Sequence, residues 1–334
     1  MVTVIHDLHL GAIRSAGTTT VSALALRRWQ LSMFDSMLDG IESDLVILGD
    51  LFDTYQIPMT DLLAAYQLLQ QWLSKGWKLT LIPGNHDLST DSSKLSSFQF
   101  MAQLLITHPN VSYIQGGGWV AESDGVYAIS HVVNQDLLNL ELAKVPTCRY
   151  LLVHANYDNN FAKDSDHSLN ISREQIDAMP QVGTAFFAHE HSHRTADRVY
   201  VAGNQFPASI SDCLDGKDKF SHTLSQNGIQ RNLVWKAADY EEIDWREPKD
   251  SEAQFIRIVG SCTPEEAADM ANMVVRYRKQ SDAFVVGNAV KVVSDDPLAE
   301  LAVSSLEDIK SFDVLGAVKN LLTARQVEIL EGLA

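Results

Sequence analysis

Five short stretches in the first 200 residues combine carboxylate, imidazole and amide side chains that could bind metal ions. They read "HDLHLG", "GDLFD", "GNHD", "VHAN" and "AHEH", and their candidate residues are Asp7, His9, Asp50, Asp53, Asn85, His86, Asp87, His154, His189 and His191. Such a mixed donor set suits a pair of first-row divalent ions, with Mn²⁺ as the leading choice and Mg²⁺ as the alternative. Two ions about 3.5–4 Å apart, sharing a carboxylate, clamp a phosphate and activate water. The set therefore predicts phosphoester hydrolysis.

Each of these stretches follows a short apolar run that has the character of a buried strand. Strands are expected at 2–5, 44–50 and 78–87, and further on within 126–132, 150–155, 184–189 and 199–203. Apolar residues at helical spacing predict helices over 24–41 and 60–77, the second capped by Thr60. The alternation favours an α/β fold with its site at the strand ends. A single motif could be an ordinary turn or a core histidine, but five in order at strand ends are not a chance pattern.

Composition limits the classes of function. The chain has 334 residues and a net charge of −17, which argues against a protein that coats nucleic acid by charge alone. Three cysteines in no CxxC pair disfavour a disulfide framework and a thiolate zinc site. We find neither a run of roughly 20 apolar residues nor the pattern of a signal peptide, so we expect no membrane association and a cytoplasmic location.

The pattern restarts near residue 250. Apolar strands at 253–261 and 283–294 flank a helix that begins near Thr263, where Thr263 and Glu266 form a capping box. We therefore predict a main domain over 1–245, a small βαβ capping domain over 250–298, and C-terminal helices over 303–334. The apolar stripes of those helices either bind a partner or pack on the small domain.

Taken together, the five motifs resemble those of the calcineurin-like metallophosphoesterases over about residues 1–215. Within that superfamily the chain is most similar to the SbcD type of DNA-repair nuclease, including its phage relatives. The resemblance rests on "DLHLG", "GDLFD", "IPGNHD" and the segment "VYVAGNQFPASISD" at 199–212. It implies an α/β fold built as a β-sandwich flanked by helices, with a small C-terminal α/β domain and terminal helices.

The resemblance also implies roles for the candidate residues. One metal would be held by Asp7, His9, Asp50 and His191, and the other by Asp50, Asn85, His154 and His189. His86 would act as general acid or transition-state stabiliser, oriented by Asp87 or Asp53. The implied partners are DNA and an SbcC-like coiled-coil ATPase, contacted through residues 303–334, and the resemblance allows a homodimer.

Two features depart from the family pattern or leave a choice open. Ala188 stands where the family's last motif usually has glycine. The final histidine pair is either His189 with His191 or His191 with His193. The distance to Gly203 fits the first choice, in which His193 is a neighbour of the site or an exposed loop residue.

Three functions remain to be compared. The first is a Mn²⁺-dependent DNA exonuclease or endonuclease, the second is a small-molecule phosphodiesterase or phosphatase, and the third is a non-catalytic binding module. The complete ligand set and His86 count against the third, and the missing Arg-Gly and Glu signatures exclude a protein Ser/Thr phosphatase. The C-terminal extension favours the nuclease, whereas the acidity favours the small substrate. The basic residues Arg194, Arg198, Lys217 and Lys219 either meet a phosphate backbone or form a solvated face.

Overall fold

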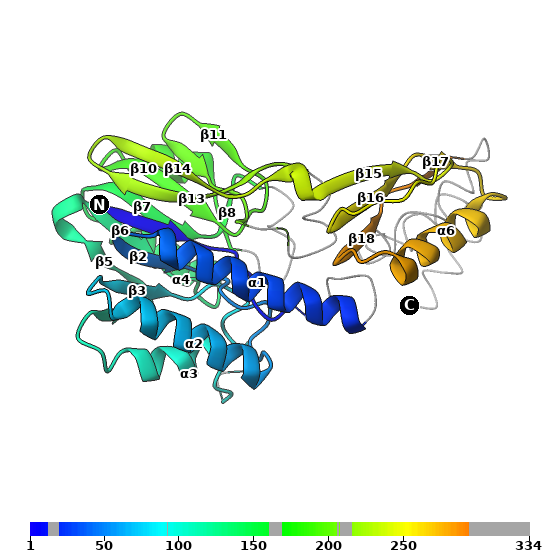
Figure 1. Cartoon of the computed structure of the whole chain (residues 1–334). Coiled ribbons are helices and arrows are strands. Elements are labelled where there is room, and N and C mark those ends of the chain that lie inside the picture. The colour runs from blue at the N-terminus through cyan, green and yellow to red at the C-terminus, as the bar shows by residue number, and fades with distance from the viewer. Residues whose placement is uncertain (13–19, 92, 160–168, 206, 208–215, 294–334) are drawn as a thin grey trace, which may run out of the picture. The chain divides into compact units, whose positions relative to one another are not determined.

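Two six-stranded sheets form the main body of the protein (Figure 1). The computed structural model describes residues 1–12, 20–91, 93–159, 169–205, 207 and 216–293. The first sheet has the order β14-β13-β1-β2-β3-β4, formed by Gly228–Trp235, Lys219–Ser225, Val2–Ile5, Asp44–Leu48, Leu79–Ile82 and Val111–Tyr113. The second sheet has the order β11-β12-β10-β7-β6-β5, formed by Arg194–Ala196, Val199–Val201, Val182–Ala188, Cys148–His154, Val126–Ile129 and Gly117–Ala121.

The centre of each sheet is parallel. In the first sheet β1, β2, β3 and β4 run in one direction, and β13 pairs antiparallel with β1. In the second sheet β6, β7, β10 and β12 are parallel to their neighbours, whereas β5 and β11 are antiparallel edges. The carboxyl ends of parallel neighbours lie at one edge of a sheet, so each sheet gathers the loops that follow its central strands.

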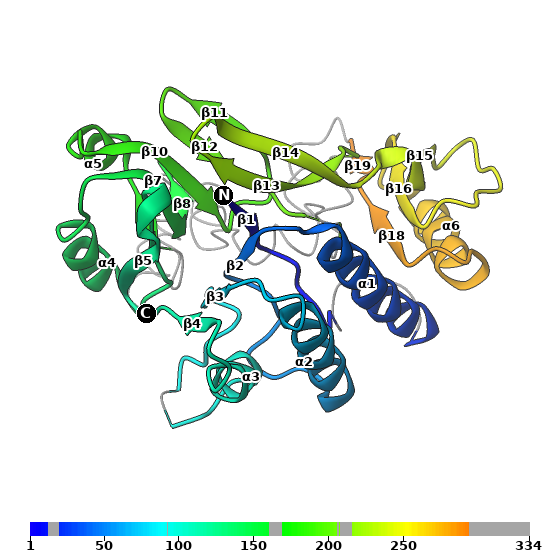
Figure 2. The same cartoon turned by 60° about the vertical axis from the view of Figure 1, so that its left-hand side comes forward.

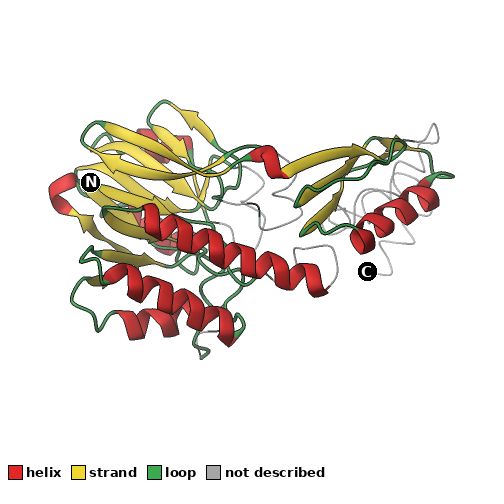
Figure 3. Ribbon diagram, viewed as in Figure 1, coloured by secondary structure: helices red, strands yellow, loops and turns green. Residues whose placement is uncertain are grey.

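Apolar residues on both faces of the two sheets form three hydrophobic cores. Val46 and Leu48 of β2 face the second sheet, in a cluster that includes Leu152 and Phe186. Their neighbours Leu45 and Ile47 face the opposite way, into a core with α1 (Thr20–Gly40), α2 (Met59–Leu73) and α3 (Ser97–Leu105). The outer face of the second sheet packs on α4 (Gln135–Leu142) and α5 (Arg173–Asp177). Figure 2 shows this order of helix, sheet, sheet and helix, and Figure 3 distinguishes the helices from the strands by colour. The predicted helix-flanked β-sandwich is confirmed.

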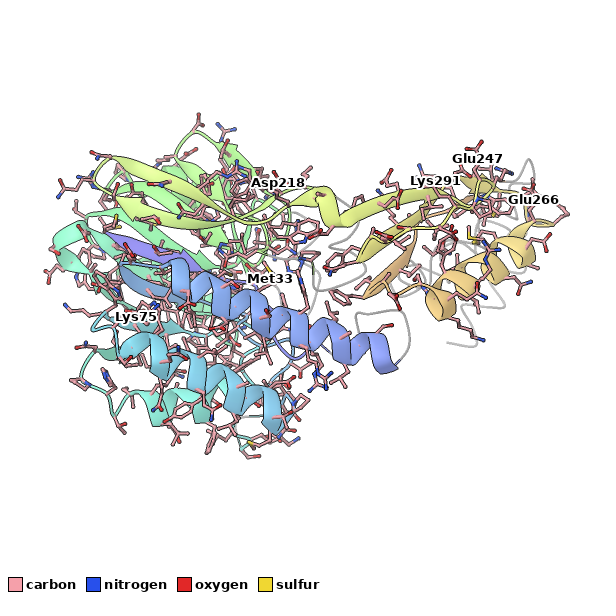
Figure 4. The ribbon with its side chains drawn as sticks, in the orientation of Figure 1. Met33, Lys75, Asp218, Glu247, Glu266 and Lys291 are labelled. Carbon is pink, nitrogen blue, oxygen red and sulfur yellow. The ribbon has the colours of Figure 1, made fainter. Side chains whose placement is uncertain are left out.

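Helices α1 and α2 are also joined by ion pairs. Nε of Arg27 donates to Oδ2 of Asp61 at 2.6 Å, and Nζ of Lys75, labelled in Figure 4, lies 3.2 Å from Oδ1 of Asp39. The predicted capping role of Thr60 is wrong, because α2 begins at Met59 after Pro58 and no side chain caps it.

The C-terminal part of the described chain forms a three-stranded sheet of order β15-β16-β18, from Tyr240–Asp244, Phe255–Val259 and Val285–Asn288. Helix α6 (Ala267–Gln280) follows the reciprocal hydrogen bonds of Thr263 and Glu266, which close the turn before it. Glu266, labelled in Figure 4, also accepts from Arg246.

Contacts between residues divide the chain into two compact units. The first holds Met1–Glu241, Ser251–Arg257 and Arg278–Gly287, and the described residues of the second are Glu242–Asp250, Ile258–Tyr277 and 288–293. The predicted boundaries at 245 and 250 stay a prediction, and the predicted helices at 303–334 lie outside the described residues. A helix long and apolar enough to cross a membrane is not found in the described part of the chain.

Candidate metal centre

The candidate ligands stand at the carboxyl ends of five central strands, three in the first sheet and two in the second. Asp7 and His9 follow β1, Asp50 follows β2, and Asn85 follows β3. His154 is the last residue of β7, and His189 and His191 follow β10. Because strands of both sheets end here, ligands more than 180 residues apart in sequence meet at one place.

Two groups of three side chains bring their ligand atoms within 4.8 Å of one another. The first is Asp7, His9 and His191, and the second is Asp50, His154 and His189. A third group, formed by His9, Asp50 and His86, overlaps both. Asp50 therefore lies where a carboxylate shared by two ions would have to lie.

Close contacts join the candidate ligand atoms to one another. Nε2 of His9 lies 3.2 Å from Nε2 of His191. Nε2 of His154 lies 3.2 Å from Oδ2 of Asp50 and 3.1 Å from Oδ1 of Asn85. The Nδ1 atom of His154 donates to the main-chain carbonyl of Leu48 at 3.1 Å. This bond fixes the ring and leaves Nε2 as its ligand atom, as in many metal-binding histidines.

The hydrogen bonding of Asp7 also fits a bound metal ion. Oδ2 of the fully buried Asp7 accepts hydrogen bonds from His6 Nδ1 and from the main-chain nitrogen of His189. Its other oxygen, Oδ1, is buried and has no hydrogen-bond partner among the described residues. A buried carboxylate oxygen without a donor is costly, and a bound cation would remove that cost. Together with the imidazole and amide donors, this supports a site for two divalent ions.

Electrostatics put Asp50, His9 and His189, but not His154, in the protonation states that bind cations at neutral pH. Burial on its own raises the pKa of Asp50, but His154, together with His86 and His9, offsets this effect and the pKa falls well below the usual value. Burial lowers the pKa of His154, yet the Asp50 carboxylate raises it to about 9. Burial lowers the pKa of His189 to about 4 and also lowers the pKa of His9. Asp50 is thus ionised and His9 and His189 are neutral, the forms in which they bind cations.

The comparison with protein families decides the family. The model of the calcineurin-like phosphoesterases matches residues 1–271. The chain belongs to this family. No curated protein matches the sequence.

Two solved structures resemble this calcineurin-like phosphoesterase distantly. The crystal structure of TT1561 of Thermus thermophilus is 12% identical, with a TM-score of 0.39, covering 70% of this chain and 98% of that one. A cold-active protein-tyrosine phosphatase of a psychrophilic Shewanella species is 16% identical, with a TM-score of 0.33, covering 70% of this chain and 77% of that one. At these TM-scores neither structure bears on the substrate.

Four of the candidate ligands in this phosphoesterase adopt an unusual backbone conformation. Asp7, His9, Asp50 and His189 have φ angles of 48°, 49°, 49° and 85°, in the left-handed region that non-glycine residues rarely adopt. Such strained residues concentrate at functional sites, where the surrounding structure holds them. Strand β10 ends at Ala188, so the three histidines after it do not alternate along a continued strand.

Two glycines leave room for the ligands. A Cβ atom on Gly49 would lie 2.2 Å from Nδ1 of His154, and one on Gly84 would lie 2.2 Å from Oδ1 of Asp50. Ala188, at the family's usual glycine position, is accommodated in the core between the sheets. The main chain therefore passes close to His154 at Gly49, after β2, and close to Asp50 at Gly84, after β3, and both positions require glycine.

His86 is exposed beside the two ligand groups. Its main-chain nitrogen donates to Oδ1 of Asp50 at 2.9 Å, and its ring meets the ring of His9 edge-on at 5.0 Å. Nδ1 of His86 lies 2.6 Å from the main-chain oxygen of Asp53. A carbonyl oxygen can only accept, so Nδ1 carries a proton and Nε2 is the atom available to a substrate.

The structure distinguishes the surroundings of Asp53 and Asp87, the two residues expected to orient His86. Asp53 orients His86 through its main-chain oxygen, while its carboxylate lies 3.7 Å from Nδ1 of His9. The buried carboxyl of Asp87 accepts from the main-chain nitrogens of Phe52 and Gly84 at 3.1 and 3.0 Å. Burial, together with Asp50, raises its pKa to about 7. Asp87 therefore ties the loops after β2 and β3 together, and among the described residues its carboxyl makes no hydrogen bond to the His86 ring. A short motif cannot reveal such partners.

Two of the three histidines after β10 belong to the ligand groups. His189 and His191 each join a ligand group, whereas Nδ1 of His193 lies 2.7 Å from the main-chain oxygen of Val201.

Arg194 pairs with Glu190 and donates to the main-chain oxygen of Tyr157. Arg198 donates to carbonyls at the end of α5 and the start of β10, and Lys219 is buried. Arg194 and Arg198 thus hold internal partners, and their contact with a phosphate backbone, one of the two alternatives, stays a prediction.

Sequence reasoning missed Glu190, which lies between two ligand histidines. Its Oε1 accepts from the main-chain nitrogen of Tyr157 at 2.6 Å, three residues after His154. Glu190 thereby joins the loop that carries His189 and His191 to the strand end that carries His154. The available signal was the charge pair Glu190 and Arg194 four residues apart, beside the ligands.

Proposed function

We propose that this calcineurin-like phosphoesterase is a dinuclear-metal phosphodiesterase that cleaves DNA, as the nuclease subunit of an SbcCD-like complex. The observation that carries the phosphoesterase part is the place of Asp50, which belongs to one ligand group with His154 and His189 and to another with His9 and the exposed His86. A phosphatase would need the same metals, so the choice of a diester rests on further arguments.

Two divalent cations, Mn²⁺ in our proposal, would polarise the phosphate and activate water for in-line attack. The protein's own groups position His86 and supply a proton. Asp50 belongs to the group with His154 and His189 and to the group with His9 and His86, and its Oδ1 also fixes the His86 main chain. The Asp53 carbonyl holds the His86 ring through Nδ1, so that Nε2 can give a proton to the leaving oxygen.

The case for DNA rests on the sequence. The motifs "DLHLG", "GDLFD" and "IPGNHD" resemble those of SbcD-type nucleases, and the segment at 199–212 continues the resemblance. The chain also extends beyond the sandwich into a second unit. A hydrolase of small esters has no evident need of such an extension.

A small-molecule phosphodiester is the second candidate. The net charge of −17 disfavours a polyanion, and the internal bonds of Arg194 and Arg198 remove two cations that could have bound its backbone. These observations favour a substrate that contacts little beyond the metal centre.

The test compares labelled DNA with bis-p-nitrophenyl phosphate in Mn²⁺, in Mg²⁺ and in chelator, using Asp50→Ala as the inactive control. Hydrolysis of both substrates, lost in chelator and in the variant, is the expected result. Cleavage of the small ester alone would select the second candidate. Activity that survives chelation would reject both.

The proposed partner is a coiled-coil ATPase that binds through residues 303–334, which lie outside the described residues. Co-expression with such an ATPase should yield a complex that survives size-exclusion chromatography. A chain ending at residue 302 should keep metal-dependent hydrolysis but lose the ATPase. Failure of the full chain to associate would remove the partner from the proposal and leave the hydrolase untouched.

A further inference from the structure

His6 lies between the last residue of β1 and the first candidate ligand, Asp7. Its side chain is fully buried, and its Nδ1 lies 2.8 Å from Oδ2 of Asp7. The main chain of His6 is held as well, since its nitrogen donates to Oε1 of the buried Gln205 at 3.0 Å. None of the roles assigned above uses this histidine.

The contact decides which oxygen of Asp7 faces a cation. A carboxylate accepts hydrogen bonds, so Nδ1 of His6 must carry the proton. Oδ2 of Asp7 then accepts two bonds, one from His6 and one from the main-chain nitrogen of His189 at 3.0 Å. Oδ1 of Asp7 accepts none among the described residues. One oxygen is therefore anchored to the protein and the other is left for a ligand.

The His6 ring is held by packing rather than by a second hydrogen bond. It stacks on His222 of β13 with ring centroids 5.7 Å apart at 18°, and meets Phe186 of β10 edge-on at 5.7 Å. Nε2 of His6 and both ring nitrogens of His222 have no hydrogen-bond partner in the part of the chain that the structure describes. A ring wedged between the two sheets in this way can hold Asp7 in one orientation.

We propose that His6 is a positioning residue of the metal centre, whose Nδ1–H holds Oδ2 of Asp7 and so directs Oδ1 toward one cation. Partners of this kind behind a metal ligand fix its orientation and raise its affinity for the ion. The inference rests on the metal-binding part of the proposed function and is independent of whether the substrate is DNA.

A purely structural role for His6 makes a different prediction. If His6 only fills the core between the sheets, its shape matters and its donor does not. Three variants of the full chain separate these roles. His6→Leu removes the donor, and His6→Asn retains an N–H close to the position of Nδ1. His222→Leu is the matched control, because it removes the stacked ring without touching Asp7.

Calorimetric titration with Mn²⁺ gives a readout that does not depend on catalysis. The wild type should bind two ions. His6→Leu should bind one of them about 10- to 100-fold more weakly, the usual effect of losing such a partner. His6→Asn and His222→Leu should stay close to the wild type. Wild-type affinity in His6→Leu, or an equal loss in His6→Asn or His222→Leu, would overturn the inference while leaving the metal centre intact.

A measurement on the wild type covers the case in which His6→Leu does not fold. Nitrogen-15 NMR of the imidazole rings, assigned by the signal lost in His6→Asn, should show a proton on Nδ1 of His6 in the metal-free and Cd²⁺-loaded protein. A His6 ring without a proton on Nδ1 overturns the inference. A wild type that binds no ion would instead overturn the proposed function together with it.

Discussion

Gly84 offers a sharp test of the geometry at the metal centre. A Cβ atom there would lie 2.2 Å from Oδ1 of Asp50, 2.5 Å from its main-chain nitrogen and 2.8 Å from Nε2 of His154. Real Cβ atoms essentially never approach closer than 3.0 Å, so Asp50 would have to retreat by about 0.8 Å at its carboxylate and about 0.5 Å at its main chain. A new side-chain rotamer could relieve only the first of these contacts.

Gly84→Ala should therefore disturb the ligand group of Asp50, His154 and His189 and, through the same carboxylate, the group that Asp50 forms with His9 and His86. A misplacement of about 1 Å can cost about 10²-fold in rate, and overpacking destabilises by about 1–3 kcal/mol. We expect weaker Mn²⁺ binding by calorimetry, and turnover of bis-p-nitrophenyl phosphate reduced by about 10²-fold.

Two other glycines provide controls. Gly40 has nothing within 4 Å of a built Cβ, so Gly40→Ala should change neither binding nor turnover. Gly76 also has open space but a φ of +91°, so Gly76→Ala should cost only about 1–2 kcal/mol of stability through left-handed strain. A folded Gly84→Ala protein with the Mn²⁺ affinity and turnover of the wild type would refute the packing argument.

Three further changes test the roles of single residues. Asp50→Ala should lose both ions in calorimetry, because the shared carboxylate is gone and the two cations repel each other; two ions retained would disprove sharing. His86→Ala should keep both ions but lose roughly 10²–10⁴-fold in turnover, whereas near-normal turnover would make His86 a loop residue only. Mn²⁺ affinity should rise about tenfold per pH unit from about pH 6.5 to 9, because binding must displace the proton that Asp50 holds on His154, whose pKa is raised to about 9. An affinity that is flat over this range would contradict that pairing.

The fold was predictable from the sequence where burial leaves a periodic pattern. The runs at 2–5 and 44–50 became β1 and β2 because their residues face cores on both sides. Helix α3 and the hairpin of β13 and β14 were missed. The hairpin carries a usable signal, because only Gln226 and Asn227 separate its strands and Gly228 follows them with a φ of +118°.

The candidate site was predictable in its residue types but not in the contacts that hold them. Strand ends and donor chemistry indicate Asp50 and His154, since parallel strands bring their carboxyl ends together. The carboxyl of Asp87 and the side chain of Arg194 look equally suited to chemistry in the sequence. In the structure the Asp87 carboxyl accepts from the main chain of Gly84, and Arg194 donates to the main chain of Tyr157. Burial and neighbours distant in sequence determine these partners.

The acidity of the chain and a phosphate substrate are compatible only if the site reverses the local charge. The two ligand groups contain two carboxylates, Asp7 and Asp50, and their other members are histidines. Two divalent cations would outweigh these carboxylates and leave about two positive charges at the strand ends, the largest local charge in such a site. Arg194 and Arg198 are already occupied by internal partners, so attraction of the phosphate falls to the metal centre itself. Metal loading should then control substrate binding as well as turnover.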